Sequence, residues 1–394
     1  MQTGVFFVCK KKLGALLLAL CCLVSCVRLF PLRVRAAGAA AVLPASDAAP
    51  VPLPPLSAAS AILCDGVSGV SLAEKNADAR LPMASTTKIM TGLLAIERLS
   101  PDAEITVPPQ AVGIEGSSVY LFAGERISVR TLLYALLLSS ANDAAVALAL
   151  TVSGSVEAFA DLMNARGAEL GLTNTRFVNP HGLPEDAHYT TARDLARLSC
   201  AALCNPLFAE IVATKRYTAP QEGTDGTRLF LNHNKLLRTY EGALGVKTGF
   251  TKKSGRCLVS AARRDGLLLV CVTLNAPDDW RDHAALLDFG FANYKAFSPL
   301  VESFSLPVVG GKGDVVSVRA ADTPSILFPA AHGEITVKLF APRFLFAPVA
   351  AGDEVGSAEF FEDGKPLFTI SLTAENTIEK ENTVGFFRRF FRRR

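Results

Sequence analysis

The chain has 394 residues, of which 50% are hydrophobic, and this length is enough for one large folded core and a smaller second domain. Its formal net charge is only +3, from 40 Lys and Arg against 37 Asp and Glu, and no long basic face interrupts that balance. Nucleic acid is therefore excluded as a principal partner.

Residues 1–36 are typical of an export signal. Lys10 to Lys12 precede an apolar run over residues 13–27, which is shorter than the roughly 20 residues that a bilayer span needs. The segment ending at Cys26 looks like a lipobox, residues 36–41 suit an ordinary signal peptidase, and an uncleaved anchor is the third alternative. All three predict an exported protein at the outer face of the cytoplasmic membrane.

The elements of the main domain, predicted for residues 58–297, follow an Ala/Pro-rich linker over residues 37–57. A β-hairpin is expected first, and a helix from Ala84 with an apolar stripe at a period of 3.6 residues comes next. The later elements are helices at 128–138, 143–152, 155–170 and 190–204, strands at 244–247, 256–262 and 267–274, and a helix that includes 283–289.

The last hundred residues divide into two parts. Residues 298–380 alternate apolar and polar positions between Gly, Pro and Asp turns, which predicts a small all-β sandwich. Residues 381–394 end in phenylalanines and arginines that would occupy opposite faces of a helix. This pattern predicts a tail that binds a membrane surface.

Three short motifs carry the chemistry. Ser85-Thr-Thr-Lys88 opens a predicted helix, Ser140-Ala-Asn142 lies in a turn between two helices, and Lys247-Thr-Gly249 ends a predicted strand. Each motif alone is common. Their order and their matching structural contexts together indicate a serine acyl-transfer site.

The spacing has a physical reason. Residues three apart share a helix face, so the hydroxyl of Ser85 and the amine of Lys88 can meet. Serine needs a base, and lysine can serve only when burial and a nearby cation, here Lys247, lower its pKa. The backbone N–H groups of Ser85 and Phe250 would stabilise an oxyanion, and Gly249 keeps side-chain bulk away from an approaching peptide.

These motifs resemble the low-molecular-mass penicillin-binding proteins, specifically the serine D-alanyl-D-alanine carboxypeptidases of the peptidase S11 family. The resemblance covers roughly residues 58 to 295, with Pro82-Met83 in place of the family's frequent Pro-Pro. Further similar segments are 74–78, 82–91, 177–179, 182–183, 191–194, 232–237 and 245–251, with Arg281 before 286–287 and 290–291. The implied fold is α+β, a β-lactamase-like transpeptidase fold of antiparallel sheet and helical lobe, followed by the β domain.

The resemblance also implies the role of each site residue. Ser85 would attack the penultimate D-alanine of a peptidoglycan stem peptide, with Lys88 as the general base. Ser140 would relay a proton to the departing D-alanine, and Asn142 would bind the substrate amide and Lys88. Lys247 and Thr248 would hold the terminal carboxylate. The same resemblance implies that β-lactams acylate Ser85.

Two points stay open in the sequence. Arg281 either helps to bind the carboxylate or forms a surface ion pair with Asp278, Asp279 or Asp282. The alternatives to a carboxypeptidase are a class A β-lactamase, whose Glu-x-x-Leu-Asn loop is absent between Asn142 and Lys247, and a catalytically idle wall-binding homologue. Neither a metal nor an organic cofactor is expected, because no motif for one occurs.

Overall fold

The computed structural model describes residues 52–223, 225–321 and 326–381. The predicted export signal, most of the linker and all but the first residue of the basic tail lie outside these residues. Among the helices that are described, no single one is long and apolar enough to cross a bilayer. Two bent pairs, Asn142–Ser153 with Val156–Glu169 and Ala192–Leu203 with Pro206–Ala213, meet those criteria only when taken together.

A five-stranded antiparallel sheet forms the centre of the main domain, in the order β2-β1-β9-β8-β7. Its strands are β1 (Ser60–Asp65), β2 (Ser71–Lys75), β7 (Ala243–Thr251), β8 (Gly255–Arg264) and β9 (Leu267–Leu274). The predicted hairpin is the β1–β2 pair, and the predicted strand 267–274 coincides with β9. The strand with the Lys-Thr-Gly motif, β7, is an edge strand of this sheet.

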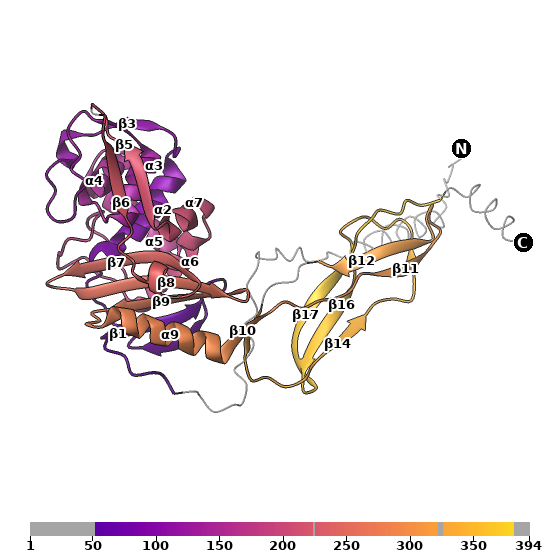
Figure 1. The fold of residues 1–394 in the computed structure, drawn as a ribbon. Coiled ribbons are helices and arrows are strands. Elements are labelled where there is room, and N and C mark those ends of the chain that lie inside the picture. The colour runs from indigo at the N-terminus through magenta and orange to yellow at the C-terminus, as the bar shows by residue number, and fades with distance from the viewer. Residues whose placement is uncertain (1–51, 224, 322–325, 382–394) are drawn as a thin grey trace, which may run out of the picture. The chain divides into compact units, whose positions relative to one another are not determined.

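Alternate side chains of the central strands enter two different cores. Ile62 and Cys64 of β1 pack with the helical lobe, whereas Ala61 and Leu63 pack against α9 (Asp279–Asn293). Figure 1 shows α9 on one face of the sheet and α6 (Ala192–Leu203) on the other. The sheet is therefore covered on both faces, which explains why β9 is buried at all eight positions.

The helical lobe is built around the helix that the first motif opens. The predicted helix begins as a 3-10 turn, η1 (Ala84–Thr87), and becomes α-helical only in α2 (Lys88–Arg98). Around α2 lie α3 (Val129–Leu138), α4 (Asn142–Ser153), α5 (Val156–Glu169) and α7 (Pro206–Ala213). The sequence analysis did not predict α7, nor the hairpin of β5 (Arg216–Pro220) and β6 (Thr227–Leu231) that follows it.

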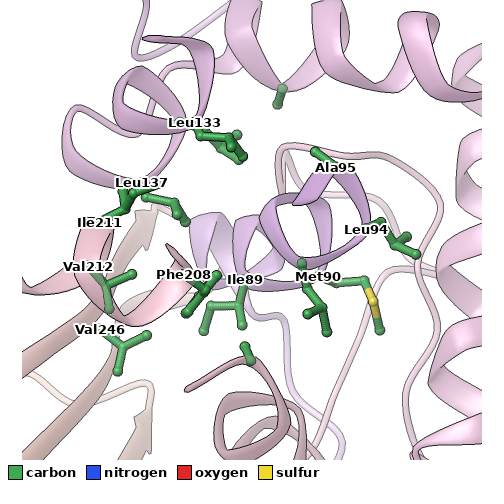
Figure 2. Packing of buried hydrophobic residues seen from close by; sticks show 14 of the residues in the cluster. Ile89, Met90, Leu94, Ala95, Leu133, Leu137, Phe208, Ile211, Val212 and Val246 are labelled. Atoms are coloured by element: carbon green, nitrogen blue, oxygen red, sulfur yellow. The ribbon is translucent and has the colours of Figure 1, made fainter. Parts of the chain in front are cut away.

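The apolar side of α2 fixes the position of the motif. Ile89, Met90 and Leu94 are fully buried and belong to the largest core cluster. Figure 2 shows them among Leu133 and Leu137 of α3, and Phe208 and Ile211 of α7. Each such side chain contributes about 1.5–3 kcal/mol when it is fully buried, so this packing holds α2 firmly in place.

The all-β domain has a six-stranded sheet in the order β14-β16-β17-β12-β11-β15. Its strands are β11 (Phe304–Val309), β12 (Val315–Ala320), β14 (Ile335–Phe340), β15 (Leu345–Phe346), β16 (Glu354–Glu362) and β17 (Lys365–Ala374). Val316, Val318, Ala358 and Leu372 are buried in a core of its own. The prediction of an all-β module is thus confirmed, although β15 and β16 were not predicted.

Two short strand pairs and two short helices complete the description. β3 (Glu104–Thr106) pairs with β4 (Arg126–Ser128), and β10 (Tyr294–Phe297) pairs with β13 (Ile326–Pro329). The remaining short helices are η2 (Pro109–Ala111) and α8 (Leu236–Thr239).

Candidate active site

A cleft of about 370 Å³ brings the three motifs together. Ser85 comes from η1, Ser140 from the turn between α3 and α4, and Thr248 with Gly249 from β7. The residues that line the cleft are Ser85, Ser117, Ser140, His233, Lys235, Thr248, Gly249, Phe250, Arg256, Asp279 and Trp280. Within the described residues, no cluster of three or more His, Cys, Asp or Glu side chains is placed to hold a metal ion.

The backbone before Ser85 is strained and is held by a chain of hydrogen bonds. Ala84 has a φ of +46°, and the hydroxyl of Thr87 donates to its carbonyl oxygen at 2.8 Å. His188 Nδ1 accepts the N–H of Val178 at 3.1 Å, so the proton lies on Nε2, which donates to the Thr87 hydroxyl at 2.7 Å. Burial lowers the pKa of His188 to about 4, which keeps the ring in this neutral form at neutral pH.

Lys88 makes three short contacts through Nζ. The distances are 3.0 Å to Ser85 Oγ, 2.7 Å to Asn142 Oδ1 and 2.7 Å to the carbonyl oxygen of His181. The Asn142 amide is oriented by its Nδ2, which donates to the carbonyl oxygen of Glu115. Because Asn142 Oδ1 and the His181 carbonyl can only accept, a neutral amine would give both its N–H groups to them and direct its lone pair at the Ser85 hydroxyl.

The electrostatics of the cleft favour that neutral amine. Lys88 is fully buried, and burial holds the pKa of its amine well below the ordinary value. The positive charge of Lys247 lowers this pKa further, while the carboxylate of Asp143 opposes the shift. Burial also lowers the pKa of Lys247, to about 7. Burial thus disfavours the charged form of both amines, and the charge of Lys247 adds to this effect at Lys88.

The second motif is held by the loop that precedes α3. Asn142 begins α4, and its backbone N–H donates to the carbonyl oxygen of Ser117 at 2.7 Å. The carboxylate of Asp143 accepts the Ser118 hydroxyl at 2.6 Å and the N–H of Leu121 at 3.1 Å. Ser140 has a φ of +60°, so the chain bends sharply just where this side chain lines the cleft.

The third motif runs directly beside the nucleophile. A Cβ at Gly249 would lie 3.0 Å from the backbone nitrogen of Ser85, so a larger residue there would need the backbone of η1 to shift by a few tenths of an ångström. Lys247 is 1% exposed, and its Nζ donates to the carbonyl oxygen of Thr248 at 2.9 Å. Phe250, by contrast, has a side chain that is mostly exposed. The structure therefore places the predicted oxyanion residues, Ser85 and Phe250, on adjoining segments.

Arg281 is not brought to the cleft with the other predicted residues. Its side chain is 69% exposed, and its Nε lies 3.3 Å from Asp278 Oδ2 in a surface ion pair. Arg256, which the sequence analysis did not single out, lines the cleft in its stead. The sequence analysis did not identify the carbonyl group of His181 as part of the site either, although the neighbouring residues 182–183 resemble the family.

Gly182 provides a test of the strained backbone. Its φ is +90°, and a Cβ there would lie 1.9 Å from the Ala84 carbonyl oxygen. We expect Gly182→Ala to lower the free energy of unfolding by about 3 kcal/mol or more and to slow acylation by penicillin. In the control Gly154→Ala, φ is +78° but the surroundings are open, so only the cost of about 1–2 kcal/mol for a left-handed backbone is expected. Thermal unfolding of both variants measures the difference, and equal losses would contradict the steric argument.

Comparisons with known proteins agree with this geometry. Residues 46–278 match the family model described as D-alanyl-D-alanine carboxypeptidase, and residues 301–380 match that of the penicillin-binding protein 5 C-terminal domain. The chain is 31% identical to D-alanyl-D-alanine carboxypeptidase DacF of Bacillus subtilis, over 84% of this chain and 88% of that protein. Its fold resembles penicillin-binding protein 5 from Haemophilus influenzae, with a TM-score of 0.66, 28% identity and coverage of 84% and 100%. It also resembles the Streptomyces K15 DD-transpeptidase, with a TM-score of 0.59, 35% identity and coverage of 61% and 100%.

Proposed function

The chain belongs to the D-alanyl-D-alanine carboxypeptidase family, and from that membership we propose that it removes the terminal D-alanine of peptidoglycan stem peptides through an acyl-enzyme on Ser85. The observation that carries this assignment is the contact of 3.0 Å between Ser85 Oγ and the buried amine of Lys88. A hydroxyl next to an uncharged amine is an activated nucleophile.

In the proposed first step, the stem peptide lies extended along the open edge of β7. Lys247 and Thr248 hold its terminal carboxylate, and the N–H groups of Ser85 and Phe250 face the carbonyl of the penultimate D-alanine. Lys88 accepts the hydroxyl proton while Ser85 Oγ attacks that carbonyl. The C–N bond then breaks as Ser140 passes its hydroxyl proton to the nitrogen of the departing D-alanine. Ser140 takes in return the proton that Lys88 had accepted, so the amine of Lys88 is neutral again before the second step.

In the second step, water releases the shortened stem. Lys88 takes a proton from the water, whose oxygen attacks the ester carbonyl, and the proton returns to Ser85 Oγ as the ester bond breaks. A β-lactam would acylate Ser85 at a normal rate, but hydrolysis of the resulting acyl-enzyme would be slow. Its leaving nitrogen stays attached to the acyl group and hinders the approach of water, so the adduct persists.

The native chain tests this proposal directly. Incubation with a peptide ending in D-Ala-D-Ala is expected to release one equivalent of D-alanine per peptide. Penicillin is expected to leave a covalent adduct that mass spectrometry locates on Ser85 and that lasts minutes or longer. Rapid loss of the adduct with hydrolysed penicillin would favour the β-lactamase alternative, and the absence of any adduct would favour the idle homologue.

We also propose that the enzyme is exported and that residues 381–394 bind the membrane. The sequence of this tail supports the proposal, with phenylalanines and arginines alternating in pairs. The N–H of Glu381 donates to the Gly310 carbonyl at 2.8 Å, and the N–H of Ala347 donates to that of Val309 at 3.0 Å. The exposed ring of Phe346 therefore lies at the same end of β11 as the start of the tail.

A truncated chain tests the role of the tail. Ending the chain at residue 381 is expected to abolish sedimentation with anionic phospholipid vesicles, because each lost arginine near such a surface contributes about 1 kcal/mol. Release of D-alanine from a soluble peptide is expected to stay at the native rate. A truncated chain that still binds vesicles would contradict this role.

A further inference from the structure

Arg256 places a guanidinium in the wall of the cleft, next to the third motif. It lies on β8, where its register partner is Phe250 of β7, two positions beyond Thr248. It lines the same cavity as Ser85 and Thr248. A cation at this point therefore faces the region where the substrate's end would lie.

The guanidinium is held in place by the start of α9. Its Nε donates to Asp279 Oδ1 at 2.9 Å, and the same oxygen accepts the N–H of Trp280 at 2.9 Å. Asp279 is 3% exposed, so this carboxylate is fixed in the protein. The guanidinium carbon also lies 5.8 Å from the centroid of the Trp280 ring, within reach of a cation–π contact.

This arrangement leaves donors for a ligand. Within the part of the chain that the structure describes, Asp279 engages Nε of Arg256 and neither of its Nη atoms. Lys235 lies 5.9 Å from the centroid of the same Trp280 ring and adds a second cation to the cleft. Among the described residues, Asp279 is the only acidic side chain that lines the cleft. A wall with two cations and one acid already engaged by Arg256 suits an anionic group, and a guanidinium fork matches a carboxylate in particular.

We propose that Arg256, held by Asp279 and Trp280, recognises the free carboxylate at the end of the substrate. It thereby makes the enzyme favour a peptide bond whose departing residue carries a free carboxylate over one whose departing group lacks it. The inference rests on the proposed function. It assigns to Arg256 on β8 the carboxylate binding that was one of the two alternatives for Arg281.

Two peptides separate this role from a structural one: diacetyl-Lys-D-Ala-D-Ala, and the same peptide with a C-terminal amide. The double variant R256Q/D279N replaces the ion pair with a neutral pair and avoids leaving Asp279 buried without its cation. We expect kcat/KM for the carboxylate peptide to fall about 10- to 100-fold, mainly through KM, while that for the amide stays within about 3-fold. R256K is expected to recover part of the preference, because it keeps the charge but loses the fork.

The outcomes are distinct. The inference would be overturned if R256Q/D279N and R256K kept the native ratio of kcat/KM between the carboxylate peptide and the amide peptide. It would also be overturned if R281Q lost this ratio while R256Q/D279N retained it. Equal losses on both peptides would also overturn it, because a merely structural role predicts them. If the native chain releases no product from either peptide, the proposed function fails, and this inference fails with it.

Discussion

Replacing Ser85 with alanine is expected to abolish covalent labelling by penicillin and to lower D-alanine release by about 10⁴-fold or more. The substitution removes only Oγ, the atom that bonds to the acyl group. The fold should survive, because the turn is held by other hydroxyls: Thr86 donates to the Met83 carbonyl at 2.6 Å and Thr87 to that of Ala84. Gel fluorescence with a labelled penicillin and an assay for free D-alanine measure the two effects.

The matched control is Ser71→Ala, at the start of β2. Its hydroxyl donates to Glu74 Oε2 at 3.1 Å and does not line the cleft, so labelling and turnover should equal those of the native chain. Ser85→Ala should also unfold at nearly the native temperature. A labelled Ser85→Ala chain would mean that another nucleophile forms the acyl-enzyme.

Replacing Lys88 with methionine is expected to slow acylation about 10³-fold and to change its dependence on pH. In the native chain the rate should rise with pH as Lys88 loses its proton, at a pKa that burial and Lys247 hold well below the ordinary value. It should fall again above about pH 7, as Lys247 loses the charge that holds the substrate carboxylate. Acylation by a chromogenic cephalosporin, followed across pH, measures both limbs.

The rising limb is the diagnostic feature, because methionine cannot accept the proton. It should disappear in Lys88→Met and remain in Lys253→Met, where an exposed lysine pairs with Asp186. A rising limb that survives in Lys88→Met would assign the base to another group.

Local pattern was enough to predict most of the elements. Strand 267–274 is a short apolar run between turns, and helix 128–138 has the capping serine that the structure uses, since Ser128 accepts the N–H of Thr131. The 3-10 start of the nucleophile's helix was not predicted. Its first residue, Ala84, has a φ of +46°, and its carbonyl oxygen lies against Gly182, nearly a hundred residues away, where a Cβ would approach it to 1.9 Å.

The site residues that belong to sequence motifs could be predicted. The residues that only the fold brings next to them were harder to predict. Ser85 and Lys88 share a turn, so their contact follows from spacing alone. The carbonyl of His181 is a backbone atom of a distant loop, and no residue type marks it. Arg256 and Arg281 look alike in sequence. Only the register of β8 and the start of α9 at Asp279 place the first in the cleft and the second in solvent.

The close approach of β7 to Ser85 limits the positions at which this enzyme could evolve resistance to antibiotics. Any side chain at position 249 would press on the backbone of η1, at 3.0 Å from Ser85 N and 3.2 Å from Thr86 N. A mutation that narrows the entrance against bulky drugs therefore cannot arise there without displacing the nucleophile itself. Resistance would have to be sought at the flanking positions, and Phe250, whose side chain is 64% exposed, has the most room to vary.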